Sequence, residues 1–380
     1  MEFKNMAKVV VIIPTYNESE IIEKTIHEVF STMSINNIMV HVLIFDSCST
    51  DKTQEIVRNL QLTYPHLHLQ IEPRKTGLGS AYLQAMQYSL YELNADIIFE
   101  FDADLSHQPH YLPEMLRLME AYKADAVIGS RYVRGGSIPK NWGWHRKFLS
   151  ILGNFVARTF LTPKYKDFTS GFRATNYLAL KKILPQQFIS NHYAYKLELL
   201  WRLHKSKAKI IEYPIAFIDR ELGKSKLPAN SIIDSLRVLT ILRYREFKSY
   251  FRMCGIGVIG MLIQYVLYNL LRMEYSPFIA AQIAVSIAIL NNYILNNRIT
   301  FKKCILNNQL KSIFIFAIYS IFTIIFQSKW AQLGVNYFGG GYIKENLIIA
   351  VGIVIGSFLN YIFYSRIIWN NKSQIELNAS

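Results

Sequence analysis

The sequence predicts two structural parts: an α/β domain with an open, mostly parallel sheet, and an all-α membrane domain. Through about residue 105, β-branched runs alternate with segments of helical periodicity, which is the pattern of strands and crossover helices. Near residue 250 the composition changes sharply, and long apolar stretches with few charges follow. The length of 380 residues agrees with this division, because it exceeds one ordinary domain.

The first part contains short apolar runs that a proline or a polar residue closes. Strands are expected over Val9–Pro14, Val40–Asp46, His68–Glu72 and Ile97–Phe101. Helices are expected from Ser19, as the N-cap, to Met33, then over Lys52–Leu62 and Ser80–Leu93. The glycines of Gly77-Leu78-Gly79 permit a tight turn into the last helix. They do not form G-x-G-x-x-G, which disfavours a dinucleotide-binding fold.

Polar residues follow the expected strand ends, where ligands bind in open parallel sheets. Asp102 and Asp104 come directly after the Ile97–Phe101 strand, and their i, i+2 spacing directs both carboxylates the same way. Like charges directed at one point repel unless a cation lies between them, and oxygen ligands favour Mg²⁺ or Mn²⁺. A solvated turn is the alternative for a D-x-D pair alone. The other polar residues at these ends are Tyr16, Glu18, Asp46 and Arg74.

The chain is strongly basic, with 42 Lys and Arg against 27 Asp and Glu and a formal net charge of +15. This charge indicates a phosphorylated ligand, an acidic membrane surface or a nucleic acid. No stripe of basic residues interleaved with exposed aromatics appears, so nucleic acid is disfavoured. The 3 cysteines are far apart and indicate neither a disulfide framework nor a zinc site. The N-terminus has no cleavable signal pattern, so the first part is expected in the cytoplasm.

Four apolar stretches in the second part are each close to the ~20 residues that a helix needs to cross ~30 Å of hydrocarbon. They cover Cys254–Leu271, Pro277–Leu295, Ile313–Trp330 and Leu347–Ile368. Basic residues gather before the first stretch, between the second and third, and after the fourth. This bias predicts that both termini and the first part are cytoplasmic. The residues are Arg243, Arg245, Lys248, Arg252, Arg298, Lys302, Lys303, Lys311, Arg366 and Lys372.

An internal repeat relates Asn292–Phe301 to Asn360–Trp369 at a constant offset. It implies two helix pairs, each with an asparagine inside the span. Asparagine is costly in hydrocarbon unless it is paired, so these side chains are expected to face other helices.

Two segments are expected at the bilayer interface. Trp142, Trp144, Arg146 and Lys147 precede an apolar face at helical spacing that runs from Phe148 to Leu161. Residues 232–252 combine a leucine and isoleucine stripe with cations just before the first span. For the first of these, an ordinary amphipathic helix packed on the sheet is the alternative.

Seven motifs occur in an order that is specific as a set. They are VVIIPTYNE (10–18), FDSCSTDKT (45–53), RKTGLGSAY (74–82), FDADLSHQP (101–109), IGSRYVRGG (128–136), DFTSGFRAT (167–175) and RELGKSKL (220–227). Together they resemble an inverting family 2 glycosyltransferase of the dolichyl/polyprenyl-phosphate mannose synthase group, over nearly all of residues 7–230. Residues 250–370 resemble the GtrA-like four-helix membrane family.

The resemblance implies a Rossmann-like GT-A domain, an open mixed sheet with helices on both faces, followed by a four-helix transmembrane domain. The implied domains are 1–229 (glycosyltransferase), 230–252 (amphipathic linker), 253–370 (GtrA-like) and 371–380 (flexible tail). The implied reaction is transfer of mannose from GDP-mannose to dolichyl or polyprenyl phosphate with Mg²⁺ or Mn²⁺, in a plasma-membrane protein.

The resemblance also implies residue roles. The implied catalytic residues are Asp102, Asp104, Arg131 and Arg220. The donor site comprises Pro14, Tyr16, Glu18, Asp46, Lys75, Asp102, Ala103 and Asp104. The acceptor phosphate is taken by Arg131, Ser225 and Lys226, and the metal by Asp104 directly, with Asp102 and Ser106. Asp167–Arg173 is placed at the sugar pocket.

Two departures from the family pattern leave alternatives open. Ser47 replaces the second aspartate of the usual D-D-x-S motif, so UDP-glucose remains an alternative donor. Ser106 stands where some members have a glutamine metal ligand, so water can complete the shell. A lipid-linked-sugar transporter with a non-catalytic soluble half is a further alternative. A processive polysaccharide synthase is disfavoured, because Q-x-x-R-W is not found.

Overall fold

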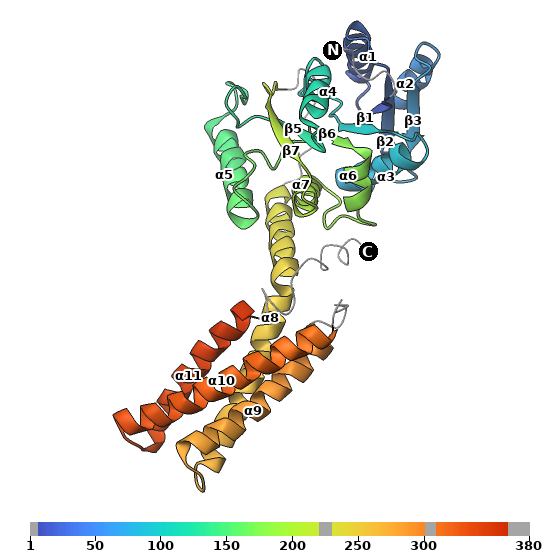
Figure 1. Cartoon of the computed structure of the whole chain (residues 1–380). Helices are drawn as coiled ribbons and strands as arrows, with labels where there is room; N and C mark the ends of the chain where they lie inside the picture. Colours follow the sequence, from blue (N-terminus) through green and yellow to red (C-terminus); the bar gives the residue numbers. More distant parts are fainter. Residues whose placement is uncertain (1–6, 220–229, 301–308, 364–380) are drawn as a thin grey trace. The chain divides into compact units, whose positions relative to one another are not determined.

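The computed structural model describes residues 7–219, 230–300 and 309–363 (Figure 1). The chain divides into two compact units, one up to Arg243 and one from Tyr244 onward. The division falls inside one long helix, α8 (Ser231–Leu271). The predicted tail, residues 371–380, lies outside the described residues.

The first unit is built on a mixed sheet with the strand order β3-β2-β1-β4-β6-β5-β7. β6 runs antiparallel to β4 and β5, and the other neighbours are parallel. Consequently β1 to β5 and β7 all end at one edge of the sheet. The strands are β1 (Val9–Thr15), β2 (Val40–Asp46), β3 (Leu67–Ile71), β4 (Ile97–Glu100), β5 (Ala126–Ser130), β6 (Arg173–Asn176) and β7 (Ile210–Pro214).

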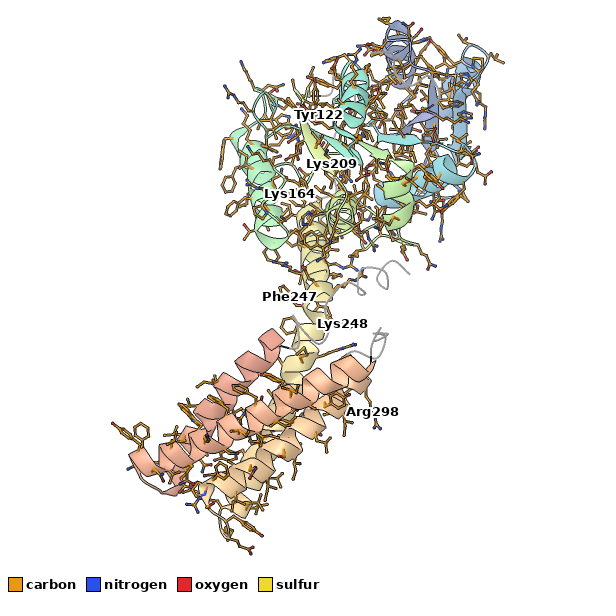
Figure 2. All side chains as sticks on the ribbon, in the orientation of Figure 1. Tyr122, Lys164, Lys209, Phe247, Lys248 and Arg298 are labelled. Atoms are coloured by element: carbon orange, nitrogen blue, oxygen red, sulfur yellow. The ribbon has the colours of Figure 1, made fainter. Side chains whose placement is uncertain are left out.

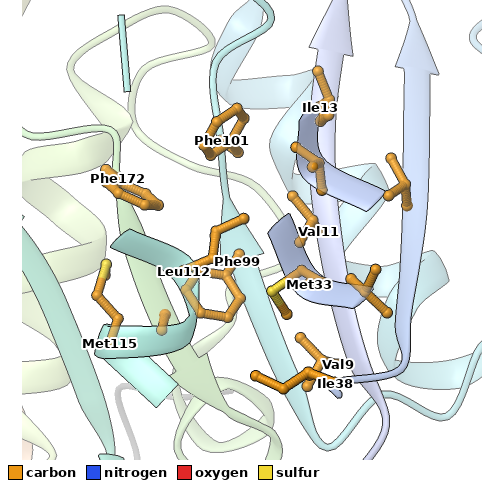
Figure 3. Packing of buried hydrophobic residues seen from close by; sticks show 14 of the residues in the cluster. Val9, Val11, Ile13, Met33, Ile38, Phe99, Phe101, Leu112, Met115 and Phe172 are labelled. Atoms are coloured by element: carbon orange, nitrogen blue, oxygen red, sulfur yellow. The ribbon is translucent and has the colours of Figure 1, made fainter. Parts of the chain in front are cut away.

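Helices cover both faces of this sheet, as predicted. Alternate residues of a strand face opposite sides, so Val9, Val11 and Ile13 pack on one helical layer and Val10 and Ile12 on another. Figure 3 shows the first layer, where Met33 and Leu112 lie against these strands. That layer contains α1 (Ile22–Ile35), α2 (Thr53–Gln61) and α4 (Tyr111–Tyr122). The other contains α3 (Leu78–Tyr91), α6 (Tyr177–Ile183) and α7 (Tyr195–Lys205).

The start of the first helix differs from the expectation. α1 begins at Ile22, so the prediction of Ser19 as its N-cap is wrong. The Ser19 amide instead donates to Asp51, which joins the loop after β1 to the loop after β2.

At Gly77 the backbone has φ +111°, and a Cβ there would lie 2.4 Å from the Asn191 carbonyl oxygen. Glycine is therefore required for the turn into α3 and for the close approach of another loop.

α5 (Trp144–Phe160) borders a third cluster of buried residues in the first unit. Ala157 of α5 packs there with Trp201 of α7 and with Leu239 and Leu242 of α8. The last two belong to the stripe predicted at the bilayer interface. Their burial shows that this part of the stripe packs on protein, whereas Ile233 is exposed.

The second unit is helical. Besides the rest of α8 it contains α9 (Pro277–Leu295), the π-helical turn η1 (Asn296–Thr300), α10 (Gln309–Phe338) and α11 (Tyr342–Phe363). Among the described residues, Phe251–Leu271 and Pro277–Leu295 are long and apolar enough to cross a membrane. The basic residues Lys248 and Arg298 have exposed side chains (Figure 2).

Several polar side chains inside this unit pair between helices, although Asn292 Oδ1 is buried without a hydrogen-bond partner among the described residues. Gln264 of α8 donates to Gln327 of α10 at 2.7 Å, and Arg272 pairs with Glu345 of α11 at 2.9 Å. Asn292 packs closely on Gly260 of α8, so it faces a helix as the repeat predicted. The side chain of Asn360, its counterpart, lies outside the described residues.

Candidate functional site

The site lies where the parallel strands end. Tyr16 and Glu18 follow β1, Asp46 ends β2, and Lys75 follows β3. Asp102–Asp104 follow β4, and Arg131 follows β5. The register brings Thr15 opposite Asp46, so the loops after β1 and β2 begin side by side. The sheet therefore assembles the described members of the predicted site at a single edge.

The backbone of the Asp102–Asp104 turn is fixed from below by hydrogen bonds. Tyr82, which is fully buried, donates to the Phe101 carbonyl at 3.2 Å, and Thr25 donates to the Ala103 carbonyl at 2.7 Å. The Ser106 amide donates to Asp104 Oδ1 at 3.1 Å. These contacts hold both carboxylates at the strand end before any ligand binds, which limits the reorganisation that binding requires.

The residues present fit a hard divalent cation. Asp102 is 29% exposed, so its carboxylate is accessible beside the anchored turn. Across the described part of the chain there is no cluster of three or more His, Cys, Asp or Glu side chains that could hold a metal by itself. Mg²⁺ is commonly bound by one or two carboxylates together with substrate phosphates and water. The Ser106 side chain is buried.

His107 lies beneath the acidic turn. Its ring stacks on Phe172 at 5.1 Å between centroids, and its Nδ1 atom lies 3.6 Å from Asp102 Oδ2. Burial lowers the pKa of His107, and the nearby Asp102 charge offsets only part of this effect. The imidazole is therefore neutral near pH 7.

A buried charged pair supports the same strand end. Glu100 lies 3.6 Å from Arg173 Nη1, and Tyr195 donates to its other oxygen at 2.9 Å. Burial raises the pKa of Glu100, although Arg173 and Tyr195 act in the opposite direction. The pair joins β4 to β6 and α7 directly below Asp102.

The nucleoside side of the predicted site is already rich in contacts. Lys75 Nζ lies 3.2 Å from the centroid of the Tyr16 ring, a cation–π contact. Asp46 is fully buried and accepts hydrogen bonds from Thr15 at 2.9 Å, from the Ser49 amide at 2.8 Å and from Gln54 at 2.7 Å. Pro14 and Glu18 are partly exposed beside them.

Arg131 is bound tightly to Asp167. Its Nε and Nη2 atoms contact the two carboxylate oxygens at 2.7 and 2.8 Å, and its Nη2 also donates to Thr169 at 2.6 Å. Burial alone would raise the pKa of Asp167, but the Arg131 charge and hydrogen bonds lower it overall. The DFTSGFR turn thus positions Arg131, for which the family resemblance implies contact with substrate phosphates.

Aromatic residues connect Arg131 to a second arginine. The Arg131 guanidinium lies 5.5 Å from the Phe217 ring, which contacts Trp142 edge-on at 5.8 Å. Arg146 stacks on Trp142 at 3.9 Å and pairs with Asp219 at 3.3 Å. The sequence assigned Arg146 to the membrane interface only, and the motifs give no signal for Phe217.

The predicted acceptor loop is not part of this geometry. Arg220, Ser225 and Lys226 lie outside the described residues. Their predicted roles stay predictions.

The outer face of α5 is apolar and exposed. Its residues are Trp144, Phe148, Leu149, Ile151, Leu152, Phe155 and Phe160. On its other side Asn154 is buried, accepts from the Phe168 amide at 2.8 Å and donates to Thr169 at 3.1 Å. A single side chain thus links the exposed apolar helix to the turn that holds Arg131.

The mixed sheet, the acidic turn after β4 and the helical second unit define a GT-A-type glycosyltransferase domain joined to a helical membrane domain. Comparison with known families agrees: residues 10–184 match Glycosyl transferase family 2, and residues 252–369 match GtrA/DPMS, transmembrane domain. The chain belongs to the polyprenyl-phosphate mannose synthase group of glycosyltransferase family 2.

Three relatives carry this assignment. Polyprenol monophosphomannose synthase of Mycolicibacterium smegmatis is 36% identical over 60% of this chain and 84% of that protein. Undecaprenyl-phosphate mannosyltransferase of Micrococcus luteus is 36% identical over 58% and 87%. Dolichol-phosphate mannosyltransferase of Pyrococcus furiosus is 30% identical over 95% and 99%, so its similarity includes the membrane domain.

Proposed function

We propose that this protein transfers mannose from GDP-mannose to a dolichyl or polyprenyl phosphate, with inversion at the sugar, on the cytoplasmic face of the membrane. The observation that carries the proposal is the meeting of Asp102 and Asp104 with Arg131 at one edge of the sheet. Carboxylates for a metal ion and a fixed guanidinium suit a reaction between two phosphorylated substrates. The relatives act, by their names, on polyprenyl, undecaprenyl or dolichol phosphates.

Asp104, with Asp102, would hold a Mg²⁺ or Mn²⁺ ion. When bound, this ion stabilises the charge that builds on the leaving nucleoside diphosphate. The anchored turn keeps the two carboxylates in place, so they need little reorganisation during the reaction. Ser106 contributes its amide to Asp104 in this arrangement.

No general base is needed for this reaction. A phosphate monoester has a second pKa of about 6, so the acceptor is largely deprotonated at neutral pH. The neutral, buried His107 supports the acidic turn without exchanging a proton with the acceptor. A single direct displacement by the acceptor phosphate would invert the configuration at the anomeric carbon.

The donor's nucleoside would lie against Pro14, Tyr16 and Glu18, with Lys75 close to its phosphates. Asp46 would contact the base or ribose only by exchanging one of its present hydrogen bonds. Ser47 leaves UDP-glucose as the second candidate donor.

The lipid phosphate would reach the site from the bilayer surface, bound by Arg131, Ser225 and Lys226, with Arg220 nearby. The exposed apolar face of α5 supports this direction of approach, because such a face suits the bilayer interface. Arg146 stacks at the start of the same helix and would suit acidic headgroups.

The second unit would anchor the enzyme, with both termini cytoplasmic. Basic residues on one side of the spans, including Lys248 and Arg298, support this orientation. Movement of the lipid-linked product across the bilayer is the alternative role of this unit.

Purified full-length protein given radiolabelled GDP-mannose or UDP-glucose with polyprenyl phosphate tests the proposal. We expect label in the lipid fraction from GDP-mannose. Label from UDP-glucose alone would identify UDP-glucose, and not GDP-mannose, as the donor. Failure of both donors, with folded protein and added Mn²⁺, would refute the synthase assignment.

A further inference from the structure

Lys196 is a buried cation beside the acidic turn, and the sequence motifs do not single it out. It lies in the first turn of α7 and is only 7% exposed. A Cβ built on Gly171 would lie 2.2 Å from Lys196 Nζ and 3.4 Å from Asp102 Oδ2. The ammonium and the Asp102 carboxylate therefore border the same small space, which glycine leaves open.

Among the residues that the structure describes, the ammonium of Lys196 makes no hydrogen bond and no ion pair. It makes a cation–π contact with Tyr193, at 5.7 Å from the ring centroid. Glu100 lies close to Arg173, at 3.6 Å, and accepts a hydrogen bond from Tyr195, but its Oε1 atom has no hydrogen-bond partner in the described part of the chain. Leaving a charge buried and unpaired is costly, so such a group is usually retained for a ligand or a charge partner.

Nearby groups show where the Lys196 charge acts. After burial, Asp102 and Lys196 have the largest effects on the pKa of His107, and Lys196 lowers it. Lys196 also lowers the pKa of Glu100, after the larger effects of burial, Arg173 and Tyr195. The Lys196 charge thus acts on both His107 and Glu100.

A divalent ion held by Asp102 and Asp104 would neutralise the Asp102 carboxylate, which borders the same space as the Lys196 ammonium. The Lys196 ammonium would then be available to bind an anion at the same place. Both substrates of the proposed reaction bring phosphate oxygens there, and a fixed cation in a buried site stabilises an anion more strongly than one in water.

We propose that Lys196 binds a phosphate oxygen of a substrate at this site, either in the donor's diphosphate or in the acceptor's monophosphate. This inference rests on the proposed function. It adds an anion-binding residue from α7 to a site otherwise made by loops at the strand ends.

The test compares the full-length protein with Lys196→Met, Gly171→Ala and the double variant. Lys196→Met keeps much of the side-chain stem and removes the charge. Gly171→Ala keeps the charge, but the new methyl group displaces the flexible end of Lys196. Lys205→Met, an exposed lysine on the same helix, is the matched control.

We measure GDP binding by calorimetry with Mn²⁺, and KM and kcat for the donor and for polyprenyl phosphate. Lys196→Met and Gly171→Ala should each weaken GDP binding, or raise the KM for one of the two substrates, by about tenfold or more. The reason is that a hydrogen bond to a charged group is lost. The double variant should be no worse than Lys196→Met, because both changes remove the same contact. Lys205→Met should match the wild type.

The affected substrate identifies the phosphate: weaker GDP binding means the donor, and a raised KM for polyprenyl phosphate alone means the acceptor. Unchanged binding, KM and kcat in folded Lys196→Met, with only thermal stability altered, would overturn the inference and leave Lys196 as a balance for buried acids. If Lys196→Met does not fold, Gly171→Ala decides by the same criteria. Inactive wild-type protein would count against the proposed function, whereas GDP binding tests Lys196 without turnover.

Discussion

Arg131 and Asp167 form a bidentate ion pair in which the arginine is only 10% exposed and the aspartate is fully buried. The Arg131 amide also donates to Asp167 Oδ2, at 3.0 Å. The pair fixes both the backbone and the guanidinium of Arg131. Its geometry depends on the turn that Asn154 of α5 supports, so α5 helps to hold Arg131, the residue proposed to bind the acceptor phosphate, in place.

Asp167→Asn should destabilise the protein and reduce transfer, because it leaves a buried guanidinium without its counter-charge. Breaking a buried pair costs about 3–5 kcal/mol. Glu114→Gln, which breaks the exposed pair with Arg117, should cost less than about 1 kcal/mol. Thermal unfolding and turnover of both variants check this, and wild-type stability of Asp167→Asn would show that the pair is not structural.

Asp104→Ala should abolish metal-dependent transfer and leave the fold intact. Asp104 is partly exposed at a turn that is held independently by Tyr82 and Thr25. Circular dichroism and turnover over a range of Mn²⁺ concentrations check the two parts of this prediction. Turnover equal to that of the wild type would show that Asp104 is not a metal ligand.

The protein should lose stability in mild acid through His41. Burial lowers its pKa to about 4 from 6.5, with the charges of His66, Lys8 and His68 acting in the same direction. Its Nδ1 atom lies 3.0 Å from His68 Nε2. The unfolded chain takes up a proton near pH 6.5 and the folded chain does not, so this stability is complete above that pH and is lost as pH falls towards 4.

Melting temperatures of the wild type and His41→Gln at about pH 7.5 and about pH 5 measure this effect. The decrease on acidification should be smaller in His41→Gln. His110→Gln, at an exposed histidine, should behave like the wild type. An equal decrease in all three proteins would assign the acid sensitivity to other groups.

The apolar face of α5 should matter for lipid substrates and not for soluble ones. Phe148→Ser with Phe155→Ser should raise KM for a long-chain lipid phosphate in vesicles by roughly tenfold or more, because burying one phenylalanine contributes about 1.5–3 kcal/mol. KM for a short, soluble prenyl phosphate should not change. Leu178→Ser, at an exposed leucine of α6, is the control, and an equal effect from it would contradict a specific interface role for α5.

The edge that carries the site is predictable from the sequence, because alternating strands and helices place every parallel strand end on one side. This places Tyr16, Asp46 and Asp102 together without knowledge of side-chain contacts. The hydrogen bonds that occupy Asp46 are not predictable, since no periodicity relates it to Thr15 and Gln54.

The contacts of the cationic residues Arg131 and Lys196 also cannot be predicted from the sequence. Arg131 and Asp167 are 36 positions apart, and neither motif identifies the other as its partner. Lys196 occupies a helix whose pattern suggests an ordinary packed helix, and its burial beside Gly171 appears only when β6, α7 and the acidic turn come together.

The most direct test of the central claim is the dependence of mannosyl transfer on both the metal and the acceptor phosphate. Wild-type protein is incubated with radiolabelled GDP-mannose and either polyprenyl phosphate or polyprenol, with Mn²⁺ or with EDTA. We expect a labelled lipid only with polyprenyl phosphate and Mn²⁺. Equal labelling of polyprenol, or undiminished transfer in EDTA, would contradict it.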